Sequence, residues 1–206
     1  QALSIFGDHA DVMSARQTGF ALLATGSVQE IMDLAPVAHL AAIEGRVPFM
    51  HFFDGFRTSH EIQKVEAADQ DEIAKLVNWK ALKEYRDRAL NPEHPVTRGT
   101  AQNPDIYFQT RELQNKYYYA LPDIVAKYMK AMSKITGREY APFTYYGAKD
   151  ATNILIAMGS ITDVIKTVVD KLNAEGKKVG MVSVHLYRPF SVKHLLAVVP
   201  KTVERI

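Results

Sequence analysis

Apolar residues recur every three or four positions along much of the chain, which is the spacing of amphipathic helices. The first such stretch runs from Val28 to Ile43. Ser27 and Glu30 form the S-x-x-E pattern of a capping box in front of it, so we expect the helix to begin there. Pro36 lies well past the first turn, where proline removes a backbone donor and crowds an earlier carbonyl, so we expect a kink.

Two more helical stretches follow. One spans residues 71–90, and Asn78 is expected to divide it. Between residues 91 and 110 the periodic pattern disappears, and several prolines punctuate a long polar loop. The next helix is predicted to open at Pro122, because proline suits the first helical position. It is predicted to end at Gly137, because glycine suits the residue just past the last turn.

Strands are indicated by short, nearly continuous apolar runs. Val47–Phe53 is such a run and is broken by Asp54-Gly55. A run of this kind is typical of a strand that is covered on both faces, as in a parallel sheet. The shorter run Leu3–Phe6 is expected to be a strand of the same type.

Beyond residue 150 the pattern alternates between strand and helix. We expect strands at 153–158 and 179–186, a helix striped over 164–172, a helix after Ser191, and a third strand beginning at Thr202. This alternation implies right-handed βαβ crossovers and a parallel sheet. The sequence therefore predicts an α/β fold.

Composition excludes several classes of protein. The chain has 206 residues, of which 47% are apolar and 23% charged, so it is expected to be globular rather than disordered. Its 25 basic and 23 acidic residues nearly balance, which gives no broad cationic field for nucleic acid. It holds no cysteine, and therefore no disulfide, thiolate nucleophile or iron–sulfur ligand. No apolar run approaches the ~20 residues that span a membrane, and neither end resembles a signal peptide or a natural terminus. We therefore expect a piece of a longer protein that contacts no membrane.

Most isolated motifs carry little chemistry. None of the seven histidines shows the helical spacing of a metal pair, and no serine-hydrolase elbow occurs. Gly159-Ser160, directly after a predicted strand, resembles the start of a phosphate-binding turn but lacks its further glycines. A plain strand-to-helix turn is the simpler interpretation of that pair.

Two polar clusters follow the first two predicted strands. The first cluster begins at Gly7–Asp11, which contains Asp8 and His9, and continues to Arg16–Gly19. The second cluster, Asp54–Glu61, contains Asp54, Arg57 and His60. Because ligands bind beyond the carboxyl ends of parallel strands, the two loops could line one site for an anionic substrate. Two solvated loops held by caps and salt bridges explain the same residues equally well.

These clusters also carry a resemblance to a known family. The segments that carry it are Ala2–His9, Ala15–Phe20, Phe52–Glu61, Asn91–Pro95, Arg98–Asp105 and Leu186–Phe190. In this order they closely resemble pyruvate:ferredoxin (flavodoxin) oxidoreductases, and the similarity covers essentially the whole chain. The resemblance implies oxidative decarboxylation of pyruvate with coenzyme A, using thiamine diphosphate, magnesium and 4Fe-4S clusters. It also implies a cytoplasmic homodimer that passes electrons to ferredoxin or flavodoxin.

The resemblance further implies how the chain is divided. Residues 1–140 look like the C-terminal part of the pyrimidine-binding domain, which has the thiamine-diphosphate-binding fold. Residues 141–150 are expected to be a linker, and residues 151–206 look like the start of a domain similar to the transketolase C-terminal domain. The glutamate that activates thiamine and the arginine that binds pyruvate in this family would precede Gln1, and no cofactor would be wholly bound by this chain. A sister enzyme for another 2-oxo acid, and a fragment that is inactive by itself, both remain open.

Site residues follow as a hypothesis from the resemblance and the position of the loops. Leu3 and Ile5 are expected to contact the substrate pocket, while Asp8, His9 and Arg16 order its rim. Asp54, Arg57 and His60 form the second loop of that rim. For Arg16, a buried salt bridge that joins loop to helix is an almost equally good interpretation.

Overall fold

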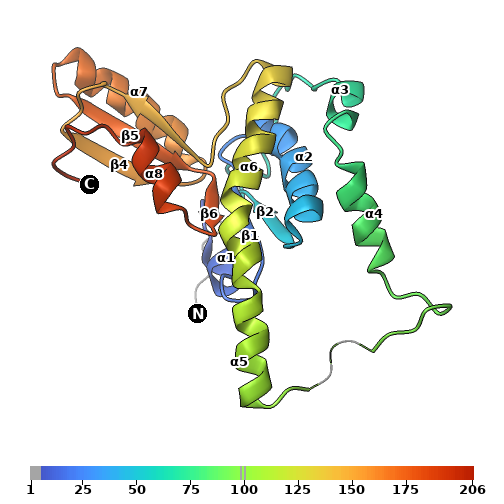
Figure 1. Ribbon diagram of the computed structural model, residues 1–206. Coiled ribbons are helices and arrows are strands. Elements are labelled where there is room, and N and C mark those ends of the chain that lie inside the picture. The colour runs from blue at the N-terminus through green and yellow to red at the C-terminus, as the bar shows by residue number, and fades with distance from the viewer. Residues whose placement is uncertain (1–5, 98, 100) are drawn as a thin grey trace.

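The computed structural model describes residues 6–97, 99 and 101–206, so Leu3 and Ile5 lie outside the described residues. The chain forms two small sheets with helices packed against them (Figure 1). The fold is therefore α/β, as the sequence predicts. None of the described helices is both long enough and apolar enough to cross a membrane.

The first sheet has the strand order β2-β1-β6. Its strands are β1 (Ala21–Ala24), β2 (Phe49–Phe52) and β6 (Leu186–Arg188). β1 pairs parallel with β2 and antiparallel with β6, and all four of its residues are buried. Ala21 and Leu23 pack into one apolar cluster, and Leu22 and Ala24 into another on the opposite face. We call the first sheet and the helices packed against it the first unit, and the second sheet with its helices the second unit. β1 is therefore the centre of the first unit, although the sequence patterns did not predict it.

Two long helices pack together with β1 in the larger core. They are α2 (Val28–Gly45) and α6 (Asn115–Thr136). At the start of α2 the Ser27 hydroxyl accepts a hydrogen bond from the Glu30 N–H at 3.2 Å, which confirms the predicted cap. α2 continues on both sides of Pro36, so the proline does not end it.

α6 begins earlier than the sequence predicts. Pro122 lies inside the helix rather than at its first position. Tyr117 and Tyr118, in the part before the proline, pack against the core, and this tertiary contact extends the helix beyond its expected start. Gly137 ends α6 in the left-handed region with φ 71°, as predicted.

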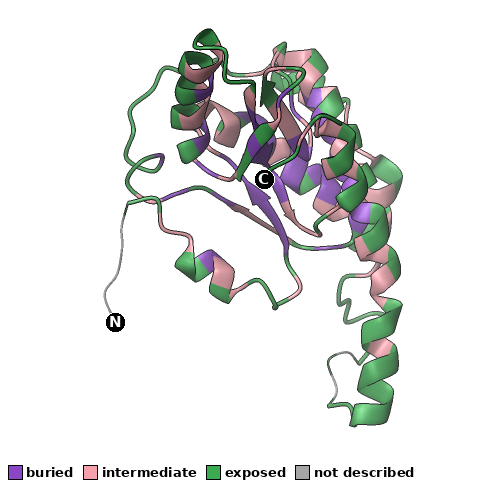
Figure 2. Cartoon of the chain, turned by 90° about the vertical axis from the view of Figure 1, so that its left-hand side faces the viewer, coloured by how far each residue is buried: buried purple, intermediate pink, exposed green. Residues whose placement is uncertain are grey.

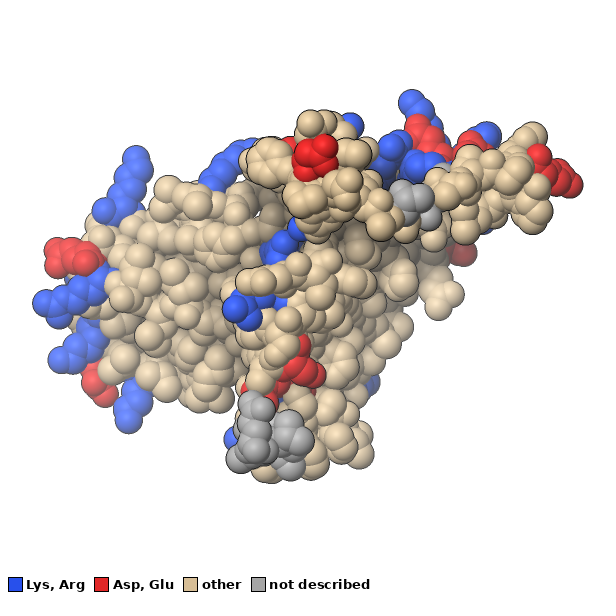
Figure 3. All heavy atoms as spheres, turned by 90° about the horizontal axis from the view of Figure 1, so that it is seen from below, with Lys and Arg blue, Asp and Glu red and all other residues tan. Residues whose placement is uncertain are grey.

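The shorter helices lie outside this core. They are α1 (Ala10–Ser14), α3 (Gln70–Ala74), α4 (Trp79–Asp87) and α5 (Pro104–Leu113). The Asn78 side chain caps α4 by accepting from the Ala81 N–H at 3.1 Å, which confirms the predicted division of the 71–90 stretch. α5 occupies part of the expected loop, holds no buried residue, and projects from the body below α6 (Figures 1 and 2). Viewed from below, broad areas of the surface carry no charged side chain (Figure 3).

The second sheet has the order β3-β5-β4. Its strands and helices are β3 (Phe143–Gly147), β4 (Asn153–Ala157), α7 (Ile161–Ala174), β5 (Val179–Val184) and α8 (Val192–Val198). β4, α7 and β5 form the predicted parallel βαβ unit, and Ser191 caps α8 as expected. At the expected third strand, the described structure records a single parallel bridge, between Asn153 and Arg205.

Two expectations about the sheets are wrong. The expected linker at 141–150 contains β3, which pairs antiparallel with β5 in the second sheet. Because β1 pairs antiparallel with β6 in the first sheet, neither sheet is purely parallel. The predicted strand at 179–186 is two strands, because the chain leaves the second sheet at His185 and enters the first as β6. The Ala24 N–H donates to the His185 carbonyl at 2.7 Å, so this crossing ties the two sheets together.

Candidate functional site

The start of the first polar loop, Gly7–His9, lies beside the second polar loop at the carboxyl ends of β1 and β2. The Gly7 N–H donates to the Gly55 carbonyl at 3.4 Å, and the rings of Phe6 and Phe56 lie 5.2 Å apart. The turn between β4 and α7 meets the same edge from the second unit. These three segments enclose a cavity of about 760 Å³, which we call the carboxyl-edge cavity. Its lining includes Phe6, His9, Asp54, Arg57, Glu61, Ser160 and Asp163.

Asp54 joins the two units. The residue is only 2% exposed, and its carboxylate accepts hydrogen bonds from the Ser160 N–H at 3.1 and 3.2 Å and from the Ser160 hydroxyl. Ser160 precedes α7, where the unpaired N–H groups and the helix dipole favour a negative charge. The Asp54 carboxylate occupies the position that a phosphate would take, so Gly159-Ser160 is not a phosphate-binding turn.

Backbone approaches backbone at the same junction. Gly159 has φ 84°, and a Cβ there would lie 2.8 Å from His9 Nε2 and 3.1 Å from Asp54 Oδ1. A Cβ on Gly26, which follows β1, would lie 2.7 Å from the Gly159 carbonyl oxygen. Both positions therefore require glycine for steric reasons, and the two units contact each other without an intervening side chain at this point.

His9 is held inside this junction. The edge of its ring packs against Phe52, with centroids 5.4 Å apart and the planes at 80°. Its Nδ1 is buried and has no hydrogen-bond partner among the described residues. His9, Asp54 and Ser160 are the residue types of a nucleophilic triad, but the Ser160 hydroxyl donates to Asp54 and not to His9. Among the described residues, the Ser160 hydroxyl therefore has no histidine partner of the kind that a nucleophilic triad requires.

Asp8 and His60 lie on the outer side of the rim, in an adjacent cavity of about 560 Å³. Asp8 Oδ1 accepts from the Ala10 N–H at 3.0 Å, which fixes the start of α1. The His60 ring stacks on Phe56 with centroids 4.5 Å apart, and its Nδ1 shares a hydrogen bond of 2.8 Å with Ser59. The structure thus brings Asp8, His9, Arg57 and His60 to one edge, on both sides of Phe56.

Arg16 does not join them. Its Nη1 donates to the Met13 carbonyl at 2.6 Å, and the residue is exposed and lines neither cavity. Among the described residues it has no carboxylate partner, so a buried salt bridge is also wrong for this side chain. A short helix that ends at Ser14 turns the chain away from the rim before Arg16 is reached.

Sequence reasoning missed a pair of a partly buried acid and a buried histidine behind the site. Glu30 Oε1 lies 3.5 Å from His185 Nε2, and Glu30 Oε2 accepts from the Gly26 N–H at 2.7 Å. Burial by itself would raise the pKa of Glu30, but the hydrogen bond and charge of His185 and the Gly26 N–H together hold that pKa below its usual value. The capping-box pattern indicated Glu30 but not its partner, which lies on the strand crossing between the sheets.

Comparison with known proteins identifies the family. The family described as "Pyruvate flavodoxin/ferredoxin oxidoreductase, thiamine diP-bdg" matches residues 1–130, and "Pyruvate:ferredoxin oxidoreductase core domain II" matches residues 151–205. This chain belongs to the pyruvate flavodoxin/ferredoxin oxidoreductase family. It is similar over its whole length to a pyruvate-flavodoxin oxidoreductase of Klebsiella pneumoniae (61% identical) and a pyruvate:ferredoxin oxidoreductase of Moorella thermoacetica (60%).

A third relative has a different name. The chain is 50% identical over its whole length to a "Pyruvate dehydrogenase [NADP(+)]" of Cryptosporidium parvum, of which it covers 11%. It spans 18% of the length of the Klebsiella and Moorella proteins. The similarity therefore concerns one part of much longer oxidoreductases.

Thiamine diphosphate is the cofactor that the matched family's description states. The described residues do not fit its diphosphate group or the metal that would hold it. No group of three or more potential metal ligands gathers among residues 6–97, 99 and 101–206, and the α7 N-terminus is already filled by Asp54. At the carboxyl-edge cavity, Arg57 is the one lysine or arginine among the described lining residues, and it lies beside the carboxylates of Asp54, Glu61 and Asp163, which would repel a diphosphate.

Proposed function

We propose that this chain is part of a thiamine-diphosphate-dependent 2-oxo acid oxidoreductase that acts on pyruvate. In this reaction the pyruvate carboxylate leaves as CO₂ and the acyl group is transferred to the coenzyme A sulfur to give acetyl-CoA. The two electrons released pass through 4Fe-4S clusters to ferredoxin or flavodoxin. The observation that carries the proposal is 61% identity over the whole chain to a protein named pyruvate-flavodoxin oxidoreductase.

Within that enzyme, residues 1–140 would be the later part of the pyrimidine-binding domain and residues 151–206 the start of a transketolase C-terminal-like domain. Thiamine diphosphate with magnesium, when bound, supplies the electron sink for decarboxylation, and the protein supplies orientation and electrostatics. The remaining domains of the polypeptide would hold the diphosphate, the metal and the clusters. We place the enzyme in the cytoplasm, as a homodimer.

The role of this chain at the site is to shape one wall of the substrate pocket. His9 and Arg57 line the carboxyl-edge cavity, where a guanidinium can bind the carboxylate of a 2-oxo acid. Leu3 and Ile5 lie close in sequence to Phe6, which also lines the cavity, and would extend its apolar wall to exclude water. Asp8 and His60 would order the rim, and Arg16 would act only on the loop, through Met13.

A panel of 2-oxo acids tests the substrate. The full-length enzyme is given coenzyme A, a low-potential acceptor and each acid in turn, and pyruvate is expected to give the highest kcat/KM. Faster turnover of another 2-oxo acid would favour the sister-enzyme alternative. The purified 206-residue chain is expected to show no turnover, because the groups assigned to the cofactor lie elsewhere.

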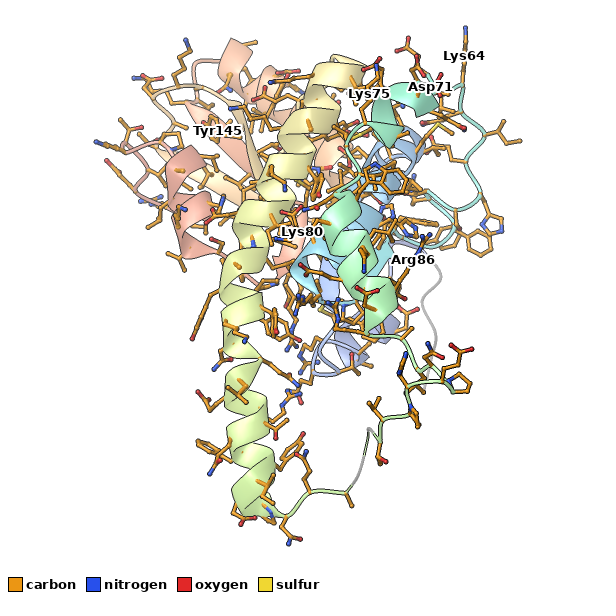
Figure 4. All side chains as sticks on the ribbon, turned by 45° about the vertical axis from the view of Figure 1, so that its right-hand side comes forward. Lys64, Asp71, Lys75, Lys80, Arg86 and Tyr145 are labelled. Atoms are coloured by element: carbon orange, nitrogen blue, oxygen red, sulfur yellow. The ribbon has the colours of Figure 1, made fainter. Side chains whose placement is uncertain are left out.

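Arg57→Gln tests the assignment of the cavity. In the full-length enzyme this substitution is expected to raise the KM for pyruvate about tenfold, because it removes one charge-assisted hydrogen bond. Arg86→Gln is a matched control, since Arg86 is an exposed arginine on α4 that lines neither rim cavity (Figure 4). An unchanged KM in Arg57→Gln, together with unchanged turnover in His9→Ala, would show that this edge does not contact the substrate.

A further inference from the structure

A second cavity lies at the opposite edge of the first sheet. Thr18 and Gly19 precede β1, and Val47 and Pro48 precede β2, so the cavity is at the amino ends of the parallel strands. It has a volume of about 300 Å³, and we call it the amino-edge cavity. Because the proposed substrate pocket lies beyond the carboxyl ends of the same strands, the two cavities are separate sites.

Two arginines line the amino-edge cavity. Arg46 ends α2 in a left-handed conformation with φ 57°, and its Nη2 donates to Glu84 Oε2 at 2.7 Å. This ion pair restrains the Arg46 side chain at the cavity. Arg111, on α5, donates from Nη1 to the Gln114 amide oxygen at 3.2 Å and has no carboxylate partner within the described part of the chain. Within the described part of the chain, the cavity therefore has two guanidinium groups and one acidic partner for them, Glu84.

Two tyrosines complete the lining and lie in a positive field. The ammonium of Lys116 is 5.0 Å from the ring centroid of Tyr117, and the guanidinium of Arg188 is 5.8 Å from that of Tyr118. The interaction with Arg46, followed by the charge of Lys116, lowers the pKa of the Tyr117 phenol below its usual value. The surroundings of this cavity thus stabilise negative charge.

We propose that the amino-edge cavity binds a carboxylate that carries a small apolar body. The planar fork of Arg111 fits the two oxygens of a carboxylate, and Arg46 adds a second positive charge. Val47, Pro48 and the ring of Tyr118 offer contacts to the apolar part. Two sources can supply this chemistry, namely a free small molecule or an Asp or Glu side chain from the rest of the polypeptide.

Equilibrium dialysis of labelled benzoate against the full-length enzyme tests the free-ligand source. The wild type is expected to bind benzoate at a site where Arg111→Gln weakens affinity about tenfold, while Arg86→Gln leaves affinity unchanged. Arg86 matches Arg111 in side chain, helical setting and exposure but does not line the amino-edge cavity.

Hydrogen exchange of the same variants tests the second source. If a carboxylate of the polypeptide fills the cavity, the wild type does not bind benzoate, and Arg111→Gln accelerates exchange in residues 104–120 while Arg86→Gln does not. Either result supports a carboxylate site. The proposal is overturned if Arg111→Gln matches Arg86→Gln both in benzoate binding and in exchange. Because neither readout depends on turnover, this outcome is distinguishable from a failure of the proposed reaction.

Discussion

Replacing Asp54 by alanine is the sharpest test of how the two units are joined. The substitution removes the carboxylate that accepts hydrogen bonds from the Ser160 N–H, at an N–O distance of 3.1 Å, and from the Ser160 hydroxyl. Asp54 is only 2% exposed, so water does not readily replace this acceptor. Losing hydrogen bonds to a buried charged group costs about 2 kcal/mol, and the lost interaction with the helix dipole adds about 1 kcal/mol. The total of about 3 kcal/mol corresponds to a roughly 100-fold increase in the opening equilibrium at the start of α7.

Hydrogen exchange with mass spectrometry on the full-length enzyme measures this opening locally. Asp54→Ala is expected to accelerate exchange of the amides in the first two turns of α7 by roughly 100-fold, while β5 keeps its protection. Asp163→Ala is the matched control, because its carboxylate lies in the first turn of the same helix but is 61% exposed and contacts only Lys166 among the basic residues described. Its expected effect is below about 1 kcal/mol. Equal exchange in the two variants would refute the view that Asp54 fixes α7 to the first unit.

Three further predictions concern the same framework. Gly159→Ala is expected to lower the thermal unfolding temperature of the enzyme more than Gly176→Ala does. Both glycines have φ above 80°, but of the two only Gly159 has neighbours within 4 Å of an added Cβ. An equal loss of stability in the two variants would contradict the close contact at Gly159. The low pKa of Glu30 means that its carboxylate stabilises the folded state above pH 4.5 and that this contribution is lost as the pH falls below 4.5. Acid unfolding should therefore be less steep in Glu30→Gln, and an unchanged pH dependence would count against a stabilising contact between Glu30 and His185. Tyr140→Phe removes the 2.6 Å hydrogen bond to the fully buried Asp33 and should lower the unfolding free energy by about 1–2 kcal/mol in urea, whereas no loss would mean that Asp33 needs no such donor.

Local sequence signals account for a large part of the fold. Ser27 and Glu30 located the start of α2, Asn78 the division before α4, and Gly137 the end of α6, because caps and breakers act over a few residues. Alternation of apolar and polar runs after residue 150 located β4, α7 and β5, because the periodicity of side chains along a strand or a helix is also a local property of the sequence.

Elements that depend on distant partners were not predictable in this way. β1 has only four residues and no visible period, and it is a strand because both of its faces are buried. The break at His185 exists because β6 pairs with β1 across the molecule, which no local pattern encodes. At the site, the sequence predicted that the two polar loops share an edge from a strand expected at Leu3–Phe6, of which Leu3 and Ile5 lie outside the described residues. The contact of Asp54 with Ser160 joins residues 106 positions apart, and no local pattern predicts it.

The stoichiometry of the reaction tests the central proposal most directly. The full-length enzyme is incubated with carboxyl-labelled pyruvate, coenzyme A and, in separate reactions, ferredoxin, flavodoxin or NADP⁺, and the labelled CO₂, acetyl-CoA and reduced acceptor are counted. We predict one CO₂ and one acetyl-CoA for every two electrons delivered to ferredoxin or flavodoxin, with all three dependent on added pyruvate and coenzyme A. Release of no CO₂, or decarboxylation without acetyl-CoA and without reduction of these carriers, would contradict the assignment.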